Sequence, residues 1–355
     1  MLPGRRPRRL RLSAEAGSLD FSSSPRCDGT HASSASDAID GCAGMVFVFG
    51  WNGHGQLGLG DCSERIAPRP LRTLAASGAV VKSIACGSNH SLVTDQHGCV
   101  WAWGDNEHGQ LGVGDRRPRL EPARIQVDGQ RVSLLACGAH HSLLCTSRGR
   151  VLSCGSHTRG QLGLKDDAER GAAGSRERLT NVVELAGSRV TAAVAGFSHS
   201  VFLTASGIVL SCGAGGSGQL GLGTAEDTRT PQAVASLTTA VRVIAAGNYH
   251  TCAVDEERTV YSWGEGRFGR LGHGTTASEF SPRPVMALQS LRVSSVACGG
   301  ACTAAIDEEG THAMLPTPCP PYPMPTLPLS HAPHARLPVH VGIVDVGPVR
   351  PGRCR

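Results

Sequence analysis

The feature that most constrains this chain is a ten-residue motif that recurs five times. Each copy has a large or sulfur-bearing residue, a Gly, four variable residues, a second Gly, Gln or Arg, and then Leu-Gly. The copies occupy residues 49–58, 103–112, 154–163, 212–221 and 263–272. A motif that returns at intervals of 51 to 58 residues indicates an architecture of small similar units that stack on one another.

A second motif precedes the glycine motif at a fixed distance. It is a Gly followed three residues later by His, at 87–90, 138–141, 196–199 and 247–250, with Cys302 in place of His at 299–302. Each of these His residues lies 14 residues before the Gly that opens the next glycine motif, whereas the other half of the unit varies from 37 to 44 residues. The constant part predicts a rigid hairpin, and we expect the variable loops to gather on one face.

Side-chain alternation identifies the strands of this hairpin. The residue before each motif Gly is aromatic or Cys, the residue two positions earlier is large, and the fourth position back is always Val. A period of two with bulk on both sides predicts a strand that packs on both faces. A Gly in four of the five units lies where the hairpin needs a turn, and Arg258 replaces it in the fourth unit.

Two further strands complete each unit. A short apolar run such as 81–86 or 241–246 precedes each Gly-x-x-His, and a Pro-containing segment follows the glycine motif near 70–71, 122–123, 231–232 and 284–285. Pro in these segments suits an edge strand. Four short antiparallel strands, repeated five times, predict an all-β chain folded as a β-propeller, because a ring of stacked sheets hides both edges and apolar faces.

These motifs together resemble the repeat of the regulator of chromosome condensation (RCC1) family. The resemblance rests on Gly-x4-Gly-Gln-Leu-Gly, on Cys/Ala-Gly-x-x-His-Ser/Thr and on Val-x-x-Trp/Cys-Gly, and it covers residues 45–311. It implies a β-propeller, which in this family usually has seven blades. The family includes exchange factors for Ran-type GTPases, a plant ultraviolet-B receptor, propellers attached to ubiquitin ligases and many interaction modules.

Two of these activities fit the sequence poorly. The receptor carries Trp-Arg directly after the Gly of Gly-x-x-His, where this chain has Ser88-Asn89, Ala139-His140, Phe197-Ser198 and Asn248-Tyr249. A ubiquitin ligase needs a further catalytic domain, which we do not expect here.

In the resembled exchange factor a prominent insertion helps to displace the nucleotide, and no insertion of that prominence stands out.

The end of the repeats leaves two arrangements open. After residues 307–311, which match 255–259, the chain reads His312-Ala313-Met314-Leu315-Pro316, and Pro316 stands where the motif Gly belongs. In the first arrangement, residues 45–49 complete the last blade and close a five-bladed ring; we lean to five units in a strained or incomplete propeller. In the second, the five repeats are part of an incomplete seven-bladed propeller.

The two tails differ from the repeats in composition. Residues 1–44 are rich in Arg and Ser, and residues 312–355 hold eleven of the 21 prolines; we expect both to be disordered. Because most of the net charge of +5 falls in the tails, a nucleic-acid partner is expected only through the N-terminal tail. No signal-peptide or membrane-length apolar run occurs, which favours a cytoplasmic or nuclear protein with no membrane contact.

No catalytic, cofactor or metal site is expected. The 14 cysteines include no Cys-x-x-Cys pair, so they are interpreted as buried structural thiols. Neighbouring His and Ser residues on a strand point to opposite faces and cannot form a dyad, so each repeated His is expected to hydrogen-bond turn backbone groups. The glycine motif lacks the Lys-Ser/Thr that a phosphate-binding loop requires.

Function is expected where the repeats differ. Candidate partner-binding residues are Trp51, Asp105 and Glu107 in the first two motifs, Lys165, Asp166, Asp167 and Arg170 in the long charged segment 165–178, and Arg267, Phe268 and Arg270 in the fifth motif. A solvated loop is the other interpretation of 165–178, and burial against a neighbouring blade is the other interpretation of Trp51 and Phe268.

These observations favour a non-enzymatic scaffold that binds a protein partner through variable loops on one propeller face. The alternative is a guanine-nucleotide exchange factor for a Ran-like small GTPase, which needs no acid-base chemistry.

Overall fold

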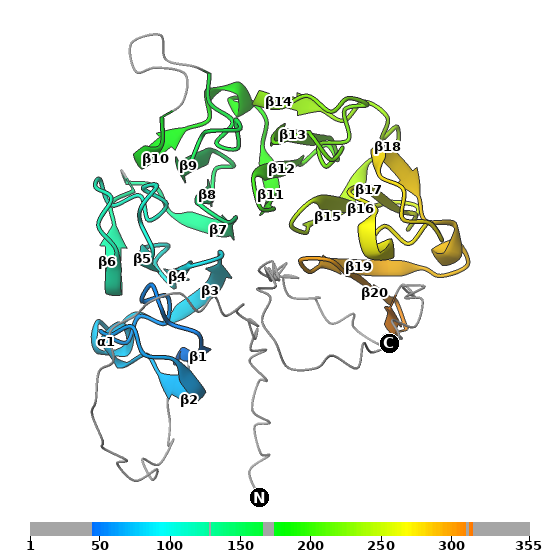
Figure 1. Ribbon diagram of the computed structural model, residues 1–355. Coiled ribbons are helices and arrows are strands. Elements are labelled where there is room, and N and C mark those ends of the chain that lie inside the picture. Colours follow the sequence, from blue (N-terminus) through cyan, green and yellow to red (C-terminus); the bar gives the residue numbers. More distant parts are fainter. Residues whose placement is uncertain (1–44, 128, 166–173, 310–311, 315–355) are drawn as a thin grey trace, which may run out of the picture.

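The computed structural model describes residues 45–127, 129–165, 174–309 and 312–314 and shows an all-β chain (Figure 1). The two tails, residues 1–44 and 315–355, lie outside the described residues. None of the helices in the described ranges is long and apolar enough to span a membrane.

Four sheets have four antiparallel strands each, and a shorter sheet lies at either end of the series. The short first sheet pairs β1 (Phe47–Gly50) with β2 (Arg65–Pro70). The first complete sheet contains β3 (Val81–Cys86), β4 (His90–Asp95), β5 (Val100–Gly104) and β6 (Arg119–Ile125). The second contains β7 (Val132–Cys137), β8 (His141–Thr146), β9 (Val151–Gly155) and β10 (Arg176–Asn181).

The remaining sheets continue this order. The third complete sheet contains β11 (Val190–Ala195), β12 (His199–Thr204), β13 (Val209–Gly213) and β14 (Thr228–Ala233). The fourth contains β15 (Val241–Ala246), β16 (His250–Asp255), β17 (Val260–Gly264) and β18 (Glu279–Pro284). The last sheet contains β19 (Val293–Cys298), β20 (Thr303–Asp307) and β21 (His312–Met314). Within the described residues, four short helices lie between strands: α1 (Arg72–Ala76), η1 (Val183–Leu185), η2 (Arg267–Gly269) and η3 (Met286–Leu288).

The 14-residue hairpin expected from the sequence is confirmed. In each complete sheet the repeated His, which opens the second strand, lies opposite the motif Gly that ends the third: His90 and Gly104, His141 and Gly155, His199 and Gly213, and His250 and Gly264. The Gly-x-x-His turns and the glycine-motif loops therefore share one face of the propeller, which we call the motif face. At the opposite end of the hairpin, Arg258 adopts a φ of 72°, the left-handed turn conformation that Gly98, Gly149 and Gly207 supply in the first three units.

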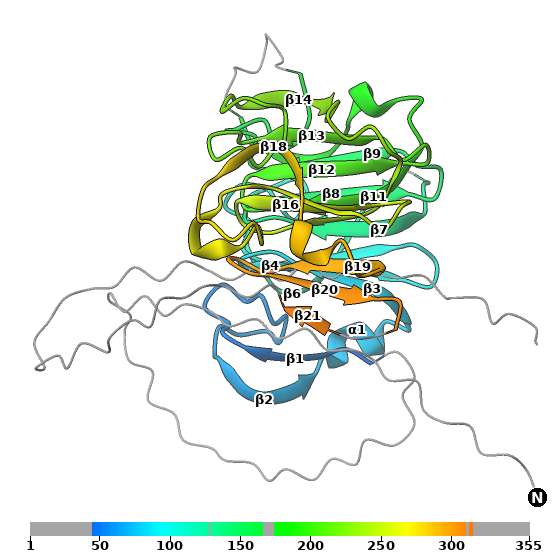
Figure 2. The ribbon, with the colours of Figure 1, turned by 90° about the vertical axis from the view of Figure 1, so that its right-hand side faces the viewer.

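The sheets are arranged around a central axis (Figure 1), and their antiparallel strands lie roughly level with one another in the side view (Figure 2). The innermost strands β3, β7, β11, β15 and β19 line a narrow central cavity of about 40 Å³. Small side chains, Ala and Cys above all, form its wall, which lets five strands approach one another closely.

The Leu of each glycine motif is buried between neighbouring sheets. Leu111, Leu162, Leu220 and Leu271 have no exposed surface, and Leu57 is also buried. Burial of one such side chain contributes about 1.5–3 kcal/mol. The motif is therefore a turn with an apolar anchor, which explains why Leu follows the Gln or Arg in every copy.

Of the two arrangements left open by the sequence, closure of a five-bladed ring by residues 45–49 is not what the structure shows. Strand β1 pairs with β2, and the free side of β20 is taken by β21, so β1 does not complete the last sheet. The backbone also keeps its register beyond residue 311, because residues 312–314 pair with Ala304–Ile306 as the third strand of that sheet. Among the described residues no strand pairing joins the first and last sheets, and Figure 1 shows an open arc.

Two further expectations need correction. The segment 165–178 is not a loop throughout, because residues 176–178 begin strand β10, and the backbone of Arg178 forms an isolated bridge with Val113. The variable loops also do not all gather on one face, because the half of each unit that varies in length includes segments at both ends of the sheet. The motif loops lie on the motif face, whereas α1, η1 and η3 follow the opposite ends of β2, β10 and β18.

The Gly of Gly-x-x-His should tolerate no side chain. A Cβ on Gly138 would collide with the imidazole of His141 and lie 2.5 Å from the carbonyl oxygen of Gly196 in the next sheet. We expect Gly138→Ala to lower the free energy of unfolding by about 1–3 kcal/mol, measured by urea denaturation. Gly216→Ala is the control, because its Cβ meets nothing within 4 Å, and it should change stability by less than about 0.5 kcal/mol. Equal effects of the two variants would contradict this explanation of the motif.

Candidate functional site

The repeated His residues join neighbouring sheets. The Nε2 atom of each lies within hydrogen-bond distance of a Ser or Thr hydroxyl on the next sheet: His90 with Ser142 at 2.9 Å, His141 with Ser200 at 3.0 Å, His199 with Thr251 at 3.1 Å and His250 with Thr303 at 2.9 Å. The expectation that these His side chains bind turn backbone groups is therefore wrong. The partner hydroxyl belongs to the Ser or Thr that directly follows the repeated His of the next unit. In the last unit, where Cys302 replaces that His, the partner is Thr303.

The same hydroxyls also hold the glycine motif. Ser142 Oγ donates to the carbonyl of Gln110 at 2.7 Å, and Ser200 Oγ donates to the carbonyl of Gln161 at 2.6 Å. Because the hydroxyl proton is used in this bond, the His Nε2–H must donate to the hydroxyl oxygen. We call each set of imidazole, hydroxyl and carbonyl a joint.

The joints are buried and uncharged. Burial lowers the pKa of His141 to about 3 and the pKa of His199 to about 4, and burial together with Arg270 lowers the pKa of His250 to about 3. Both side chains of the His141 and Ser200 pair are fully buried, so no substrate reaches them. The His and hydroxyl groups are thus structural, in agreement with the view that no His-Ser dyad acts as a nucleophile.

Aromatic and imidazole rings form a continuous series on the motif face. His108 lies in the second motif loop, and His140, Phe197 and Tyr249 lie in three successive Gly-x-x-His turns. Ring centroids are 4.8 Å apart for His108 and His140, 6.2 Å for His140 and Phe197, and 5.6 Å for Phe197 and Tyr249. We call these four half-buried residues the aromatic row. Sequence reasoning missed it, although the variable positions of the Gly-x-x-His turns were the signal.

Acidic residues lie at one end of the aromatic row. Asp105 is buried, and its carboxylate accepts hydrogen bonds from Gln110 Nε2 at 2.9 Å and from the Glu107 backbone N–H at 3.0 Å. Glu107 itself is exposed. Burial and the neighbouring His108 lower the pKa of His140, while Asp105 and Glu107 oppose that shift.

Basic residues lie at the other end. The guanidinium of Arg270, 3% exposed, lies 2.9 Å from Glu265 Oε2 and donates to the carbonyl of Gly300 at 3.2 Å. Burial and Glu265 raise the pKa of Tyr249, and Arg270 opposes that shift. The backbone N–H of Glu265 donates to the carbonyl of Tyr249 at 2.8 Å. The fifth motif loop is therefore linked to the last residue of the aromatic row.

Phe268 is the most unusual residue of this loop. It has a φ of 62°, which bulky side chains rarely adopt, and its side chain is 48% exposed. The exposed Arg267 places its Cζ atom 4.7 Å from the centroid of the Phe268 ring. Such backbone strain in an exposed aromatic residue motivates a functional hypothesis.

The structure also places two of the remaining candidates from the sequence. Trp51 is half-buried and packs edge-on against His54 at 5.3 Å. Lys165 is exposed and its Nζ lies 3.7 Å from Glu184 Oε1 on η1. Asp166, Asp167 and Arg170 lie outside the described residues.

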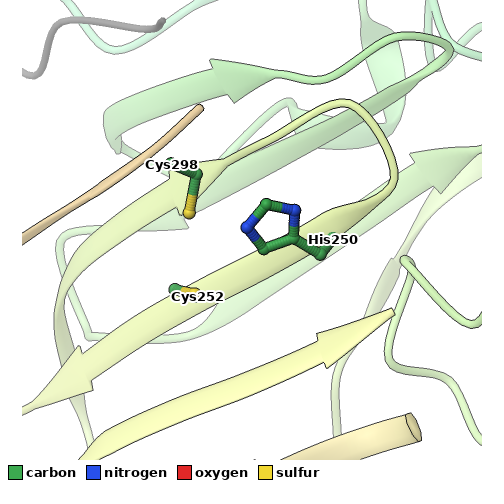
Figure 3. A group of neighbouring side chains, drawn as sticks. All are labelled: His250, Cys252 and Cys298. Carbon is green, nitrogen blue, oxygen red and sulfur yellow. The ribbon is translucent and has the colours of Figure 1, made fainter. Parts of the chain in front are cut away.

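One cluster of metal-ligating side chains was also missed. His250, Cys252 and Cys298 place a potential ligand atom each within 4.8 Å of one another (Figure 3). The cysteines are 46 residues apart in the sequence, so no short spacing indicates the group. Their approach depends on the packing of β16 against β19.

Comparison with known proteins agrees with the repeat pattern. A family model described as an RCC1-like domain matches residues 43–243, and RCC1 repeat models match residues 241–270 and 259–306. The ultraviolet-B receptor UVR8 of Arabidopsis thaliana is 34% identical over 265 residues, which cover 74% of this chain and 58% of that protein. The chain spans about half the length of the curated relatives it matches.

Solved structures show the same fold. Human WBSCR16 is 27% identical with a TM-score of 0.67, and the match covers 76% of this chain and 72% of that one. Prp20p of Saccharomyces cerevisiae, whose structure was reported with its binding properties to Gsp1p and histones, is 24% identical with a TM-score of 0.63 over 75% of this chain and 64% of that one.

The neutral joints predict acid sensitivity. His141, His199 and His250 stay uncharged in the folded protein, because their folded pKa values are about 3, 4 and 3, but they gain protons near pH 6.5 when unfolded. Stability is therefore fully present above pH 6.5 and is lost as the pH falls toward the folded pKa values. Between pH 7.5 and 5.5 we expect each imidazole to lower the free energy of unfolding by about 1.4 kcal/mol.

Urea denaturation at the two pH values tests this expectation. His141→Gln should reduce the pH dependence by about 1.4 kcal/mol, the share of one imidazole. Gln retains an N–H donor near Ser200 and carries no titratable group. A wild-type stability that does not change between pH 7.5 and 5.5 would contradict the neutral joints.

Proposed function

Because this chain belongs to the regulator of chromosome condensation (RCC1) repeat family, we propose that it is a non-enzymatic interaction module that binds a protein partner on its motif face. The family relationship supports a protein-interaction role. The joints commit their His and hydroxyl groups to the fold, so the motif face offers contact surface rather than an acid-base pair.

The aromatic row is the observation that carries this proposal. Aromatic side chains are enriched at the energetic centres of protein interfaces, because they supply large contact areas with little loss of rotamer freedom. Phe197 and Tyr249 are half-buried and lie next to each other with an interplanar angle of 27°. They therefore form a rigid apolar platform that a partner side chain could cover.

The charged ends of the row would orient the partner. Glu107 is exposed beside the His108 end, and Arg267 is exposed in the fifth motif loop, where Glu265 N–H donates to the Tyr249 carbonyl. A partner with a basic group facing Glu107 and an acidic group facing Arg267 would be held in one orientation. The residues that we assign as candidate contacts are Trp51, Glu107, Lys165, Arg267 and Phe268. The buried Asp105 and Arg270 hold their motif loops in place through hydrogen bonds.

Removing the platform should abolish partner binding. We expect Phe197→Ala with Tyr249→Ala to weaken capture of the partner at least tenfold, because interface aromatics contribute about 2 kcal/mol or more when truncated. Quantitative affinity capture with the full chain and each variant, followed by a direct binding measurement on the captured protein, gives the readout. Phe280→Ala on β18 is the matched control, since Phe280 is also partly exposed but lies on an outer strand. Partners retained equally by both variants would refute the proposed surface.

A Ran-like small GTPase is the second candidate partner. Prp20p, which shares this fold, was reported with its binding properties to Gsp1p, and exchange requires only that the factor bind the nucleotide-free GTPase more tightly than the GDP form. The chain needs no catalytic side chain for that activity.

Release of fluorescent GDP tests this second function. If the chain is an exchange factor, it should accelerate GDP release from one member of a GTPase panel by roughly a hundredfold, which corresponds to about 2.7 kcal/mol in the barrier. The Phe197→Ala and Tyr249→Ala double variant should lose that acceleration while Phe280→Ala keeps it. No acceleration by a folded chain would exclude exchange on the tested GTPases and leave the interaction module standing.

A further inference from the structure

The His250, Cys252 and Cys298 group is the one cluster of soft metal ligands in the described residues. His250 and Cys252 occupy alternate positions on β16 and therefore point to the same side of the sheet. Cys298 ends β19, the innermost strand of the next sheet. All three side chains are buried, and Figure 3 shows the imidazole and the two thiols converging.

The other repeats show that the fold does not require thiols at these positions. The positions of Cys252 and Cys298 are held by Leu92 and Cys137, by Leu143 and Ala195, and by Val201 and Ala246 at the three preceding interfaces. The imidazole recurs at all four of these interfaces, whereas two thiols lie beside it at one of them. The two cysteines therefore add something that packing alone does not need.

The donor set has the chemistry of a zinc site. Thiolate sulfur and imidazole nitrogen are the usual ligands of Zn²⁺ in proteins. Two thiolates neutralise the charge of a divalent ion, so the complex carries no net charge into an apolar interface. The hydroxyl of Thr303 lies 2.9 Å from His250 Nε2 and 3.8 Å from Cys252 Sγ, which places a fourth polar atom beside the three ligands.

We propose that His250, Cys252 and Cys298 bind one Zn²⁺ ion that fastens the last sheet to the fourth complete sheet. Each thiol releases its proton to solvent as its Zn–S bond forms, and the imidazole binds through Nε2, which gives up its hydrogen bond to Thr303 while the ring proton moves to Nδ1. Cys298 also lines the central cavity, which offers a route to a site that is otherwise enclosed. No oxidant or further reactant is needed.

Metal binding to the full chain tests the proposal. The protein is purified reduced and metal-free under anaerobic conditions and titrated with Zn²⁺, and separately with Co²⁺, whose absorption reports tetrahedral thiolate ligation. We expect one equivalent of tightly bound Zn²⁺, a sulfur-to-cobalt charge-transfer band and a higher Tm with Zn²⁺, since an ion that binds only the folded state stabilises it.

Internal repeats supply the variants. Cys252→Val with Cys298→Ala installs the pair present at the preceding interface, Val201 and Ala246, so the chain should fold but lose the bound equivalent and the charge-transfer band. Cys145→Val is the matched control, because Cys145 is an equally buried thiol outside the cluster, and it should keep both. Cys302→Ser removes the exposed thiol nearest in sequence and should also keep both.

Three results would overturn the proposal. The first is the absence of a bound equivalent at micromolar free Zn²⁺, and the second is equal binding by the wild type and the folded double variant. The third is a Cys252–Cys298 disulfide in the protein isolated without reductant, together with no Zn²⁺ binding after that disulfide has been reduced. None of these results bears on partner binding by the aromatic row, so the two proposals fail independently.

Discussion

Each interface between sheets depends on one backbone carbonyl, that of the residue before the motif Leu. The carbonyl of Gln56 accepts hydrogen bonds from Ser91 Oγ and from Trp103 Nε1, and the carbonyl of Gln110 accepts from Ser142 Oγ. These bonds lie in a buried, low-dielectric interface, where an unsatisfied carbonyl would be strongly destabilising. The turn formed by the glycine motif thus points the carbonyl of the residue before Leu toward the next sheet. The buried Leu that follows holds this turn in place between the sheets.

The local parts of this arrangement could be predicted from the sequence. The constant 14-residue spacing and the alternation before each motif Gly set the hairpin register, because both depend on residues close together in the chain. The sequence left the ring closure open because the three residues of β21 carry no repeat signature. Their pairing with β20 is made by backbone groups.

The candidate site could be predicted only in part. Trp51, Glu107 and Phe268 stood out because they depart from the repeat pattern, but the aromatic row joins turns that lie more than fifty residues apart in the sequence. His140, Phe197 and Tyr249 occupy positions that vary between repeats, so each one alone resembles an ordinary turn residue. Their ring contacts, like the approach of Cys252 to Cys298, arise only when successive sheets stack at a small rotation.

The joints are also directional. Ser142 presents its hydroxyl to the preceding sheet, while His141 on the same strand presents its imidazole to the following sheet, so each unit carries a donor side and an acceptor side that differ. Head-to-tail association of this kind does not by itself fix the number of units. The chemistry of the joint therefore sets the order and orientation of the units, and the angle between successive sheets alone determines how many units a closed ring would hold.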